Sequence, residues 1–118
     1  MAFYNPFDVE HYVGANGSNM SKFIRASEVT SPRRRWSLIQ VLDDSKDPLT
    51  CVLALGRWEN QPKLALRWNG DAKNPIGNPQ SRGLATWFIL PARYNDAMIE
   101  TLTPEMKTLA RNFLPEKR

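Results

Sequence analysis

The stretch that decides the fold is "VLALGRWENQPKLALRWNG", residues 52–70. Two runs of strand-forming, largely apolar residues flank the polar segment "ENQP", residues 59–62, which has the composition of a turn. The stretch therefore predicts an antiparallel β-hairpin. If all four residues of "ENQP" connect the strands, Trp58 lies opposite Lys63.

The two faces of this hairpin are chemically different, because side chains alternate between the faces of a strand. The first face carries the leucines and is predicted to be core: Cys51, Leu53, Leu55, Arg57, Leu64, Leu66 and Trp68. The second face collects small residues interrupted by an aromatic and two cations: Val52, Ala54, Gly56, Trp58, Lys63, Ala65, Arg67 and Asn69. Such a face can receive a flat or stranded ligand. A three-residue turn would invert this parity, and the alternative that Trp58 and Arg67 only cover a sheet edge stays open.

Further strands are expected on both sides of the hairpin. "WSLIQVL" precedes it, and "LATWFILP" follows after a long polar loop. We predict an α+β fold, a four-stranded antiparallel meander followed by C-terminal helix. The expected bounds are strands at about 36–42, 50–58, 63–69 and 84–90, and helix over 91–114.

The C-terminal segment changes to a helical period. Apolar residues recur at steps of three and four: Ile99, Leu102, Met106, Leu109 and Phe113. Thr103 followed by Pro104 and Glu105 is typical of an N-cap, a first-turn proline and a first-turn acid. This predicts two helices, or one helix with a break.

The length of 118 residues indicates one domain, which we place at 34–118. Residues 1–33 lack a sustained period and are predicted to be a loosely structured arm, in which a short helix over 21–28 has weak support. No apolar run is long enough to span a bilayer, and the N-terminus lacks the basic residues and apolar block of a secretory signal. We therefore expect a cytoplasmic protein.

Catalytic and metal chemistry are not expected. The chain has one cysteine, Cys51, and one histidine, so it offers no zinc ligand set and no Cys–His nucleophile pair. Carboxylates at Asp43, Asp44, Asp47 and Asp71 could form a set, but three of them lie in one polar turn, where solvation is their usual role. We predict no cofactor, no metal and no enzyme.

The formal net charge of +4 is unevenly distributed. Residues 22–35 hold five basic residues and one acid, residues 57–93 hold six and two, and the remainder is net acidic. Segregated positive charge with interleaved aromatics is typical of proteins that bind the phosphate backbone of nucleic acids. A solvated basic face is the alternative.

The hairpin resembles the signature hairpin of the small single-stranded-DNA-binding proteins built like the transcriptional positive cofactor, especially their bacterial members. The matching residues are Trp58, Pro62, Lys63, Leu64, Leu66, Arg67 and Trp68, with Arg82 and Gly83 where the family has Lys-Gly. The resemblance covers about 36–102. It implies a homodimer of curved four-stranded sheets, with helices packed across the two-fold axis, that binds unpaired nucleic acid with little sequence preference.

The chain departs from that family in three respects. Its fourth strand is expected to be about four residues longer, Arg67 directly precedes Trp68, and the arm and the second helical segment have no counterpart. These differences concern the dimer geometry and the nucleic-acid path more than the fold class.

The loop of residues 69–83 is the second candidate binding element. Pro75 and Pro79 restrict it, while its amides, main-chain donors and two cations are groups that grip a phosphate backbone. A solvated connection held by turns is the alternative. Together with the hairpin, the loop completes the predicted surface for single-stranded DNA or RNA: Trp58, Lys63, Arg67, Lys73 and Arg82, with Arg33, Arg34 and Arg35 tracking phosphates.

Two partner predictions complete the expectations. The C-terminal helices are expected to form a homodimer through Met98, Leu102 and Leu109, because a second copy is the commonest way to complete such burial. The alternative function is an accessory or inhibitor protein that binds a nucleic-acid-handling partner, for which Trp58 and Trp87 would serve as hot spots.

Overall fold

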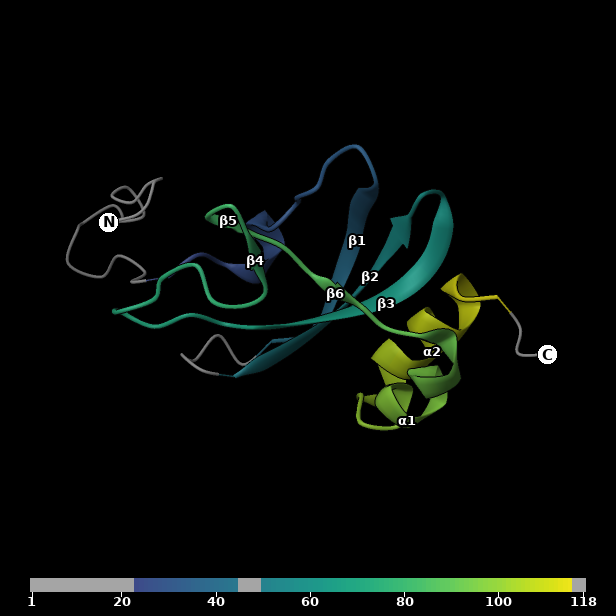
Figure 1. The fold of residues 1–118 in the computed structure, drawn as a ribbon. Coiled ribbons are helices and arrows are strands. Elements are labelled where there is room, and N and C mark those ends of the chain that lie inside the picture. Colours follow the sequence, from purple (N-terminus) through teal and green to yellow (C-terminus); the bar gives the residue numbers. More distant parts are fainter. Residues whose placement is uncertain (1–22, 45–49, 116–118) are drawn as a thin grey trace.

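The computed structural model describes residues 23–44 and 50–115. Its main sheet has four strands in the order β1-β2-β3-β6 (Figure 1). Their bounds are β1 Trp36–Asp43, β2 Cys51–Trp58, β3 Gln61–Trp68 and β6 Phe88–Ile89. The strand pairs are antiparallel, and helices follow the sheet. The predicted α+β fold class is confirmed.

The turn between β2 and β3 is tighter than expected. Trp58 pairs with Gln61, so Glu59 and Asn60 alone make the turn, with φ of 50° and 70°. Two positive φ values at the central residues are typical of a two-residue hairpin turn. The expected Trp58–Lys63 pairing is therefore wrong by two residues. Since a shift of two preserves side-chain parity, the two faces carry the predicted residues.

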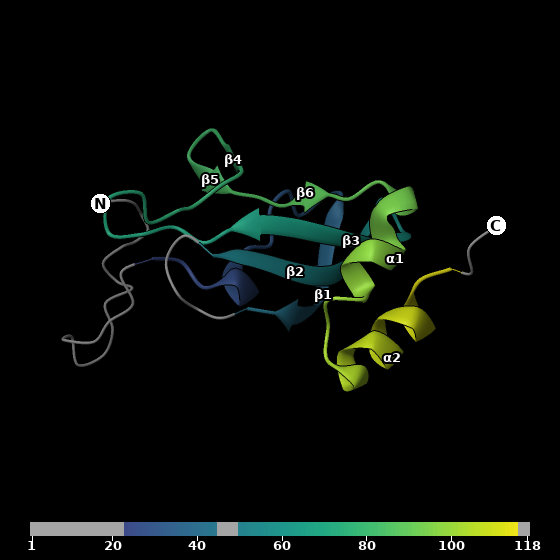
Figure 2. The ribbon, with the colours of Figure 1, turned by 90° about the horizontal axis from the view of Figure 1, so that it is seen from below.

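The expected fourth strand, 84–90, is divided. A two-stranded hairpin forms first, from β4 Gln80–Ser81 and β5 Leu84–Ala85, and the chain then crosses to the main sheet as β6. β6 pairs with the middle of β3 through Ile89 opposite Ala65 and Phe88 opposite Leu66. Figure 2 shows β6 beside β3, with the β4–β5 hairpin away from the helices.

The C-terminal segment forms a 3-10 turn, η2 Ala92–Tyr94, and two helices, α1 Asn95–Ile99 and α2 Pro104–Phe113. The Thr103 hydroxyl accepts a hydrogen bond from the Met106 amide at 3.3 Å, so Thr103 is the N-cap of α2 and Pro104 its first residue. The predicted break is confirmed. Glu100 then bonds Lys107 and Arg111 of α2, at 3.2 and 2.7 Å, and so links the end of α1 to α2.

The helices cover one face of the sheet, called here the helix-covered face. Leu55 and Leu64 are fully buried there, against Ile99 and Leu102 of the helical segment. The complete buried set is Leu42, Leu53, Leu55, Leu64, Leu90, Ile99, Leu102, Ala110 and Leu114. This is the leucine core that the hairpin sequence predicts.

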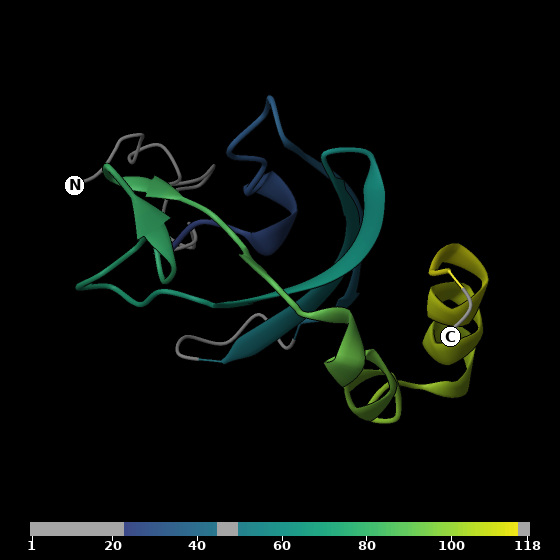
Figure 3. The ribbon, with the colours of Figure 1, turned by 45° about the vertical axis from the view of Figure 1, so that its right-hand side comes forward.

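The opposite face, called here the loop-covered face, has a core of its own. Residues 23–36, with the short 3-10 helix η1 Ala26–Glu28, and residues 75–87 lie across it. Figure 3 shows η1 on one side of the curved sheet, with α1 and α2 on the other. The buried set is Ala26, Val29, Trp36, Val52, Ala54, Ala65, Ala85 and Trp87. The sheet therefore lies between two apolar layers.

The segment assigned to the arm contributes to this second layer. Ala26 and Val29, at 1% and 2% exposure, are as deeply buried as the strands. Within the described part the expected helix is one 3-10 turn, and residues 1–22 of the arm lie outside the described residues. In residues 23–44 and 50–115, no helix has the length and apolar character that crossing a membrane requires.

Candidate nucleic-acid interface

The face expected to receive a ligand is closed. Trp36 lies against Trp87, with ring centroids 6.2 Å apart, and both indoles are buried over the small residues of β2 and β3. Trp87 also donates a hydrogen bond from Nε1 to the Val29 carbonyl at 2.7 Å. Trp87 is thus a core residue rather than an exposed hot spot. The idea that small residues leave this face open is wrong, because they make room for tryptophans from other segments.

Gly56 shows how tight this packing is. A Cβ at that position would lie 2.5 Å from Trp36 Cζ2 and 2.6 Å from the Ser37 carbonyl oxygen. Real Cβ atoms do not approach other heavy atoms so closely, so the Trp36 ring can lie flat on β2 only because residue 56 is glycine. Glycine is required at position 56 because it has no side chain, and not for its backbone freedom, since the backbone there is ordinary strand.

Arg67 is a structural residue, which corrects its predicted role as an exposed phosphate contact. Its side chain is 3% exposed, and its guanidinium donates to the carbonyl oxygens of Thr86, at 2.6 Å, and of Ile76. Desolvation lowers the pKa of Arg67 to about 10, which still leaves the group charged at neutral pH. The cation fastens both ends of the covering loop to β3 and is not accessible to a phosphate.

The polar groups of the 69–83 loop bond mainly to the loop itself. The Asp71 carboxylate accepts from the amides of Lys73 and Asn74, at 2.9 and 2.7 Å, and Gln80 Nε2 donates to Asn74 Oδ1 and the Gly77 carbonyl. The Asn78 and Trp68 backbones bond each other in both directions. These bonds favour the alternative interpretation of the loop, a connection held by turns.

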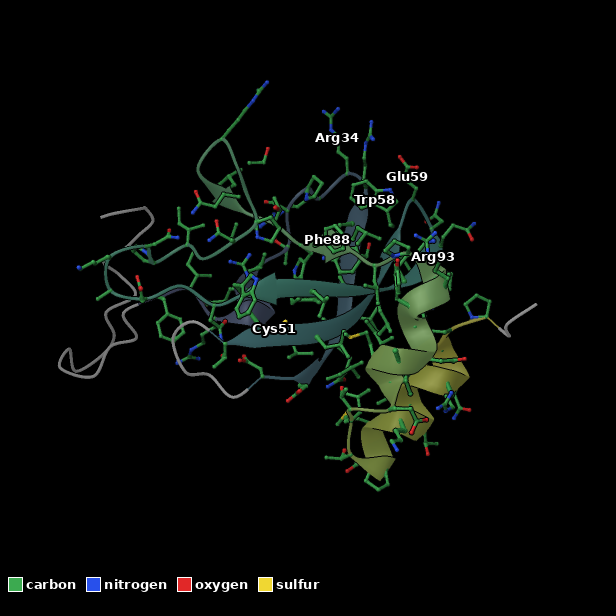
Figure 4. The ribbon with its side chains drawn as sticks, turned by 60° about the horizontal axis from the view of Figure 1, so that its bottom comes forward. Arg34, Cys51, Trp58, Glu59, Phe88 and Arg93 are labelled. Carbon is green, nitrogen blue, oxygen red and sulfur yellow. The ribbon has the colours of Figure 1, made fainter. Side chains whose placement is uncertain are left out.

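Five of the predicted contacts do meet, at the end of the sheet where β2 turns into β3. Arg33, Arg34 and Arg35 precede β1, and Trp36 pairs with Trp58. The Glu59 amide donates to the Arg35 carbonyl at 2.7 Å, and their side chains form an ion pair at 3.4 Å. Lys63 lies two residues into β3, opposite Gly56. Figure 4 shows Arg34, Trp58 and Glu59 grouped at this end.

Two further cations at this end had no place in the predicted site. Arg57 is on β2, and its guanidinium lies 4.9 Å from the Phe113 ring centroid. Arg93 follows β6. The Leu90 amide still donates to the Leu64 carbonyl of β3, so the chain stays beside β3 as it approaches Arg93. Both are exposed. Each strand of the main sheet has a basic residue in it or next to it at this end of the sheet. The sequence contains these residues, but they come together only when the strand directions are known. We call the set the basic end: Arg33, Arg34, Arg35, Arg57, Lys63 and Arg93.

Lys73 and Arg82 lie away from the basic end. Both come after Trp68, at the far end of β3, and Arg82 stands with Gly83 in the turn of the β4–β5 hairpin. Figure 1 places that hairpin and the β2–β3 turn at opposite ends of the sheet. Because β3 has eight residues, the two ends are separated by about 23 Å along the strand. The predicted residues therefore do not form one continuous surface.

The expected dimer contacts are engaged within one chain. Leu102 is 7% exposed in the leucine core, and Met98 and Leu109 are half-buried against the same core. The reason is that α1 and α2 direct their apolar side chains toward the chain's own sheet. The homodimer stays a prediction, but these three side chains offer it little free area.

Trp68 was predicted to be core and is 55% exposed. It does lie on the helix-covered face, paired with Cys51, but at the end of β2 and β3 that the helices do not reach. Phe88, opposite Leu66 on the same face, is 54% exposed. Alternation gave the correct face for Trp68, but burial also depends on how far the covering helices extend.

Within the described residues, no group of three or more His, Cys, Asp or Glu side chains could hold a metal ion. Of the carboxylates considered earlier, Asp71 caps its own loop, Asp44 accepts a hydrogen bond from Asn69 at 3.1 Å, and Asp47 lies outside the described residues. A pocket of about 610 Å³ lies beside Asp43 and Asp44, lined by Phe23, Arg25, Ser27, Val41, Leu42, Asp43, Asp44 and Asn69.

Comparisons of the chain with protein-family models, with curated proteins and with solved structures give no match.

Proposed function

We propose that this chain is a non-catalytic protein that binds single-stranded DNA or RNA at its basic end. The observation that supports this most strongly is the convergence of cations. Residues 33–37, 57–63 and 91–94 meet at one end of the sheet and carry six basic residues and one acid, Glu59. The backbone of a nucleic acid is the common ligand that such a concentration of charge attracts.

The cations of the basic end differ from those on the helices. Lys107 and Arg111 are neutralised by Glu100, and Arg111 also by Asp96. At the basic end, Arg35 pairs with Glu59, whereas Arg33, Arg34 and Lys63 have no carboxylate within 4 Å among the described residues. Unpaired cations are available to neutralise phosphates, which then release the counterions condensed on the nucleic acid, so their contribution to binding should fall with added salt.

Trp58 provides the aromatic component. It is half-buried, so part of its ring remains accessible at the edge of the loop-covered face, next to Lys63 and Arg35. Stacking of a base on an exposed ring face is worth roughly 1–3 kcal/mol and tolerates any base. One aromatic with several backbone contacts favours binding with little sequence preference.

The resemblance to the cofactor-like single-stranded-DNA-binding proteins agrees with this proposal only at the start of the hairpin. Trp58 and Lys63 lie at the basic end, whereas Arg67 is buried and Trp68 is exposed at the other end. The proposed path of the nucleic acid therefore crosses the end of the sheet and not the open face that the resemblance implies. Whether two copies bind together is tested by the mass of the free and bound protein.

The test is a titration of fluorescent oligothymidine, and of a matched duplex, followed by anisotropy between about 50 and 200 mM salt. Arg33→Ala combined with Arg34→Ala should reduce the slope of log affinity against log salt by about 1.4, at about 0.7 per phosphate on a single strand. The matched control is Lys73→Ala combined with Arg82→Ala, which removes equal charge from the opposite end and should leave the slope nearly unchanged.

Trp58→Ala should weaken oligothymidine binding about tenfold with the salt slope kept, because stacking does not release counterions. Thermal melting would verify that the variant is folded. If the parent chain does not bind oligothymidine at low salt, the proposed function is wrong. If the control pair lowers the slope instead of the arginine pair, nucleic acid binds at the other end.

A further inference from the structure

The exposed aromatics at the far end of the helix-covered face form a strip that the proposed function does not use. Trp68 and Leu66 on β3 lie between Cys51 of β2 and Phe88 of β6, and all four side chains share one face because they are cross-strand pairs or alternate neighbours. Two rings that are each more than half exposed are unusual for a soluble sheet, and we call these four residues the aromatic strip.

The strip is apolar throughout at neutral pH. Burial, and then the charge of Asp43, raise the pKa of the Cys51 thiol, so this residue stays protonated and behaves as a small apolar side chain. Leu66 is half-buried and already packs against the leucine core. The strip therefore continues the helix-covered core outward to the surface, with no polar side chain between the two.

An acidic margin borders the strip on its β1 side. Asp43 pairs with Leu53 beside a bulge in β1, and its charge acts on the Cys51 thiol, so the carboxylate lies close to the strip. The 610 Å³ pocket beside Asp43 is lined mainly from the loop-covered side, by residues such as Phe23, Arg25 and Asn69, and is not part of this surface. The surface thus combines an apolar centre with a carboxylate at its margin, whereas the basic end carries the opposite charge.

We infer that the aromatic strip is a docking surface for another protein, specifically for an apolar segment that carries a lysine or arginine. The apolar side chains of that segment would cover Trp68 and Phe88, and its cation would lie at Asp43. Buried tryptophans at interface centres are typical hot spots, with charged residues at the rim that select the partner. A nucleic acid fits poorly here, because Asp43 would repel its phosphates.

The probes are two labelled peptides that alternate leucine with lysine, or leucine with glutamate, titrated into the full chain. The chain as a whole carries +4, which favours the glutamate peptide, so a preference for the lysine peptide has to come from the local acidic margin. We expect the lysine peptide to bind at least tenfold more tightly, and Asp43→Asn to reduce that preference.

Trp68→Ser should weaken binding of the lysine peptide tenfold or more, as truncation of a hot spot does. The matched control is Tyr94→Ser, which removes an exposed aromatic outside the strip and should leave the affinity unchanged. Because Trp68 is half exposed, its substitution should not prevent folding, and thermal melting would verify this. Binding of oligothymidine by Trp68→Ser should equal that of the parent, so this inference and the proposed function can fail separately.

Four results would overturn the inference. Equal binding of the two peptides, or an unchanged affinity for Trp68→Ser, would show that the strip does not select this chemistry. A parent chain that sediments as a dimer and becomes a monomer with Trp68→Ser would assign the strip to a second copy. Loss of oligothymidine binding in the same variant would assign it to the nucleic acid.

Discussion

The two faces of the sheet are covered in different ways. On the helix-covered face, regular helices bury leucines, and the covering elements are stabilised by their own backbone hydrogen bonds and by the Thr103 cap. On the loop-covered face, the covering chain is mostly irregular. It buries two tryptophans against the sheet, where Arg67 is also buried and Gly56 leaves room for the Trp36 ring. Irregular chain satisfies only part of its own backbone groups, and the side chains Arg67 and Trp87 bond to three of its carbonyls.

The comparison indicates that substitutions in the two layers should lead to different patterns of local unfolding. A helix that loses a core contact keeps its internal hydrogen bonds. A covering loop that loses its side-chain anchors keeps its internal bonds but has few bonds that join it to the sheet, such as the Trp68–Asn78 backbone pair. We therefore expect substitutions on the loop-covered face to release a defined segment, and those on the helix-covered face to cost stability more evenly.

The largest effect is expected for Arg67→Ala. It leaves the Thr86 and Ile76 carbonyls without their charged donor and opens a cavity, which together should lower the free energy of unfolding by about 4 kcal/mol. Chemical denaturation measures the loss, and amide exchange should show residues 75–87 released before α2. Equal loss of protection in both layers would contradict the comparison. Arg67→Lys should recover part of the stability.

A smaller effect is expected for Gly56→Ala, which places a Cβ against Trp36. Overpacking of a well-filled core costs about 1–3 kcal/mol, and the Trp36 indole should move, which changes its fluorescence and near-ultraviolet circular dichroism. Ala54→Gly, on the same face and strand, is the control for backbone effects in β2. An unchanged spectrum would mean that Trp36 does not lie against Gly56.

The smallest effect is expected on the other face, for Thr103→Ala. Loss of the N-cap of α2 should cost about 1 kcal/mol, without selective release of residues 75–87. Thr103→Ser keeps the hydroxyl and should retain most of the stability. A cost as large as that of Arg67→Ala would remove the distinction between the two layers.

The hairpin faces could be predicted because parity survives an error of two residues. The turn length could not, because the polar segment "ENQP" ends in Pro62, and proline lacks the amide that a ladder needs. In the structure Pro62 lies in β3 beyond the two residues that β6 pairs. The Thr103 cap was predicted correctly, because a cap depends only on neighbouring residues.

The candidate site was harder to predict, because exposure depends on what covers a face. Residues 23–35 and 75–83 have no period, and 84–87 belong to the predicted fourth strand, so nothing in these segments marks a covering layer. The useful signal was on the sheet itself: Ala54, Gly56 and Ala65 together leave the space that Trp36 and Trp87 fill. Likewise, the basic end depends on strand directions, which place Arg57 and Arg93 beside arginines that are distant in the sequence.

The hydrogen bond between Trp87 and Val29 joins residues that are 58 positions apart. During synthesis at about 5–20 residues per second, some 3–12 s pass between the appearance of Val29 and that of its partner. Throughout this interval the apolar residues of 23–36 have been synthesised, but Trp87, which packs against them, has not. Residues 23–36 are thus the first described segment to be synthesised and among the last to complete their contacts. A chaperone that binds the growing chain would find these residues exposed.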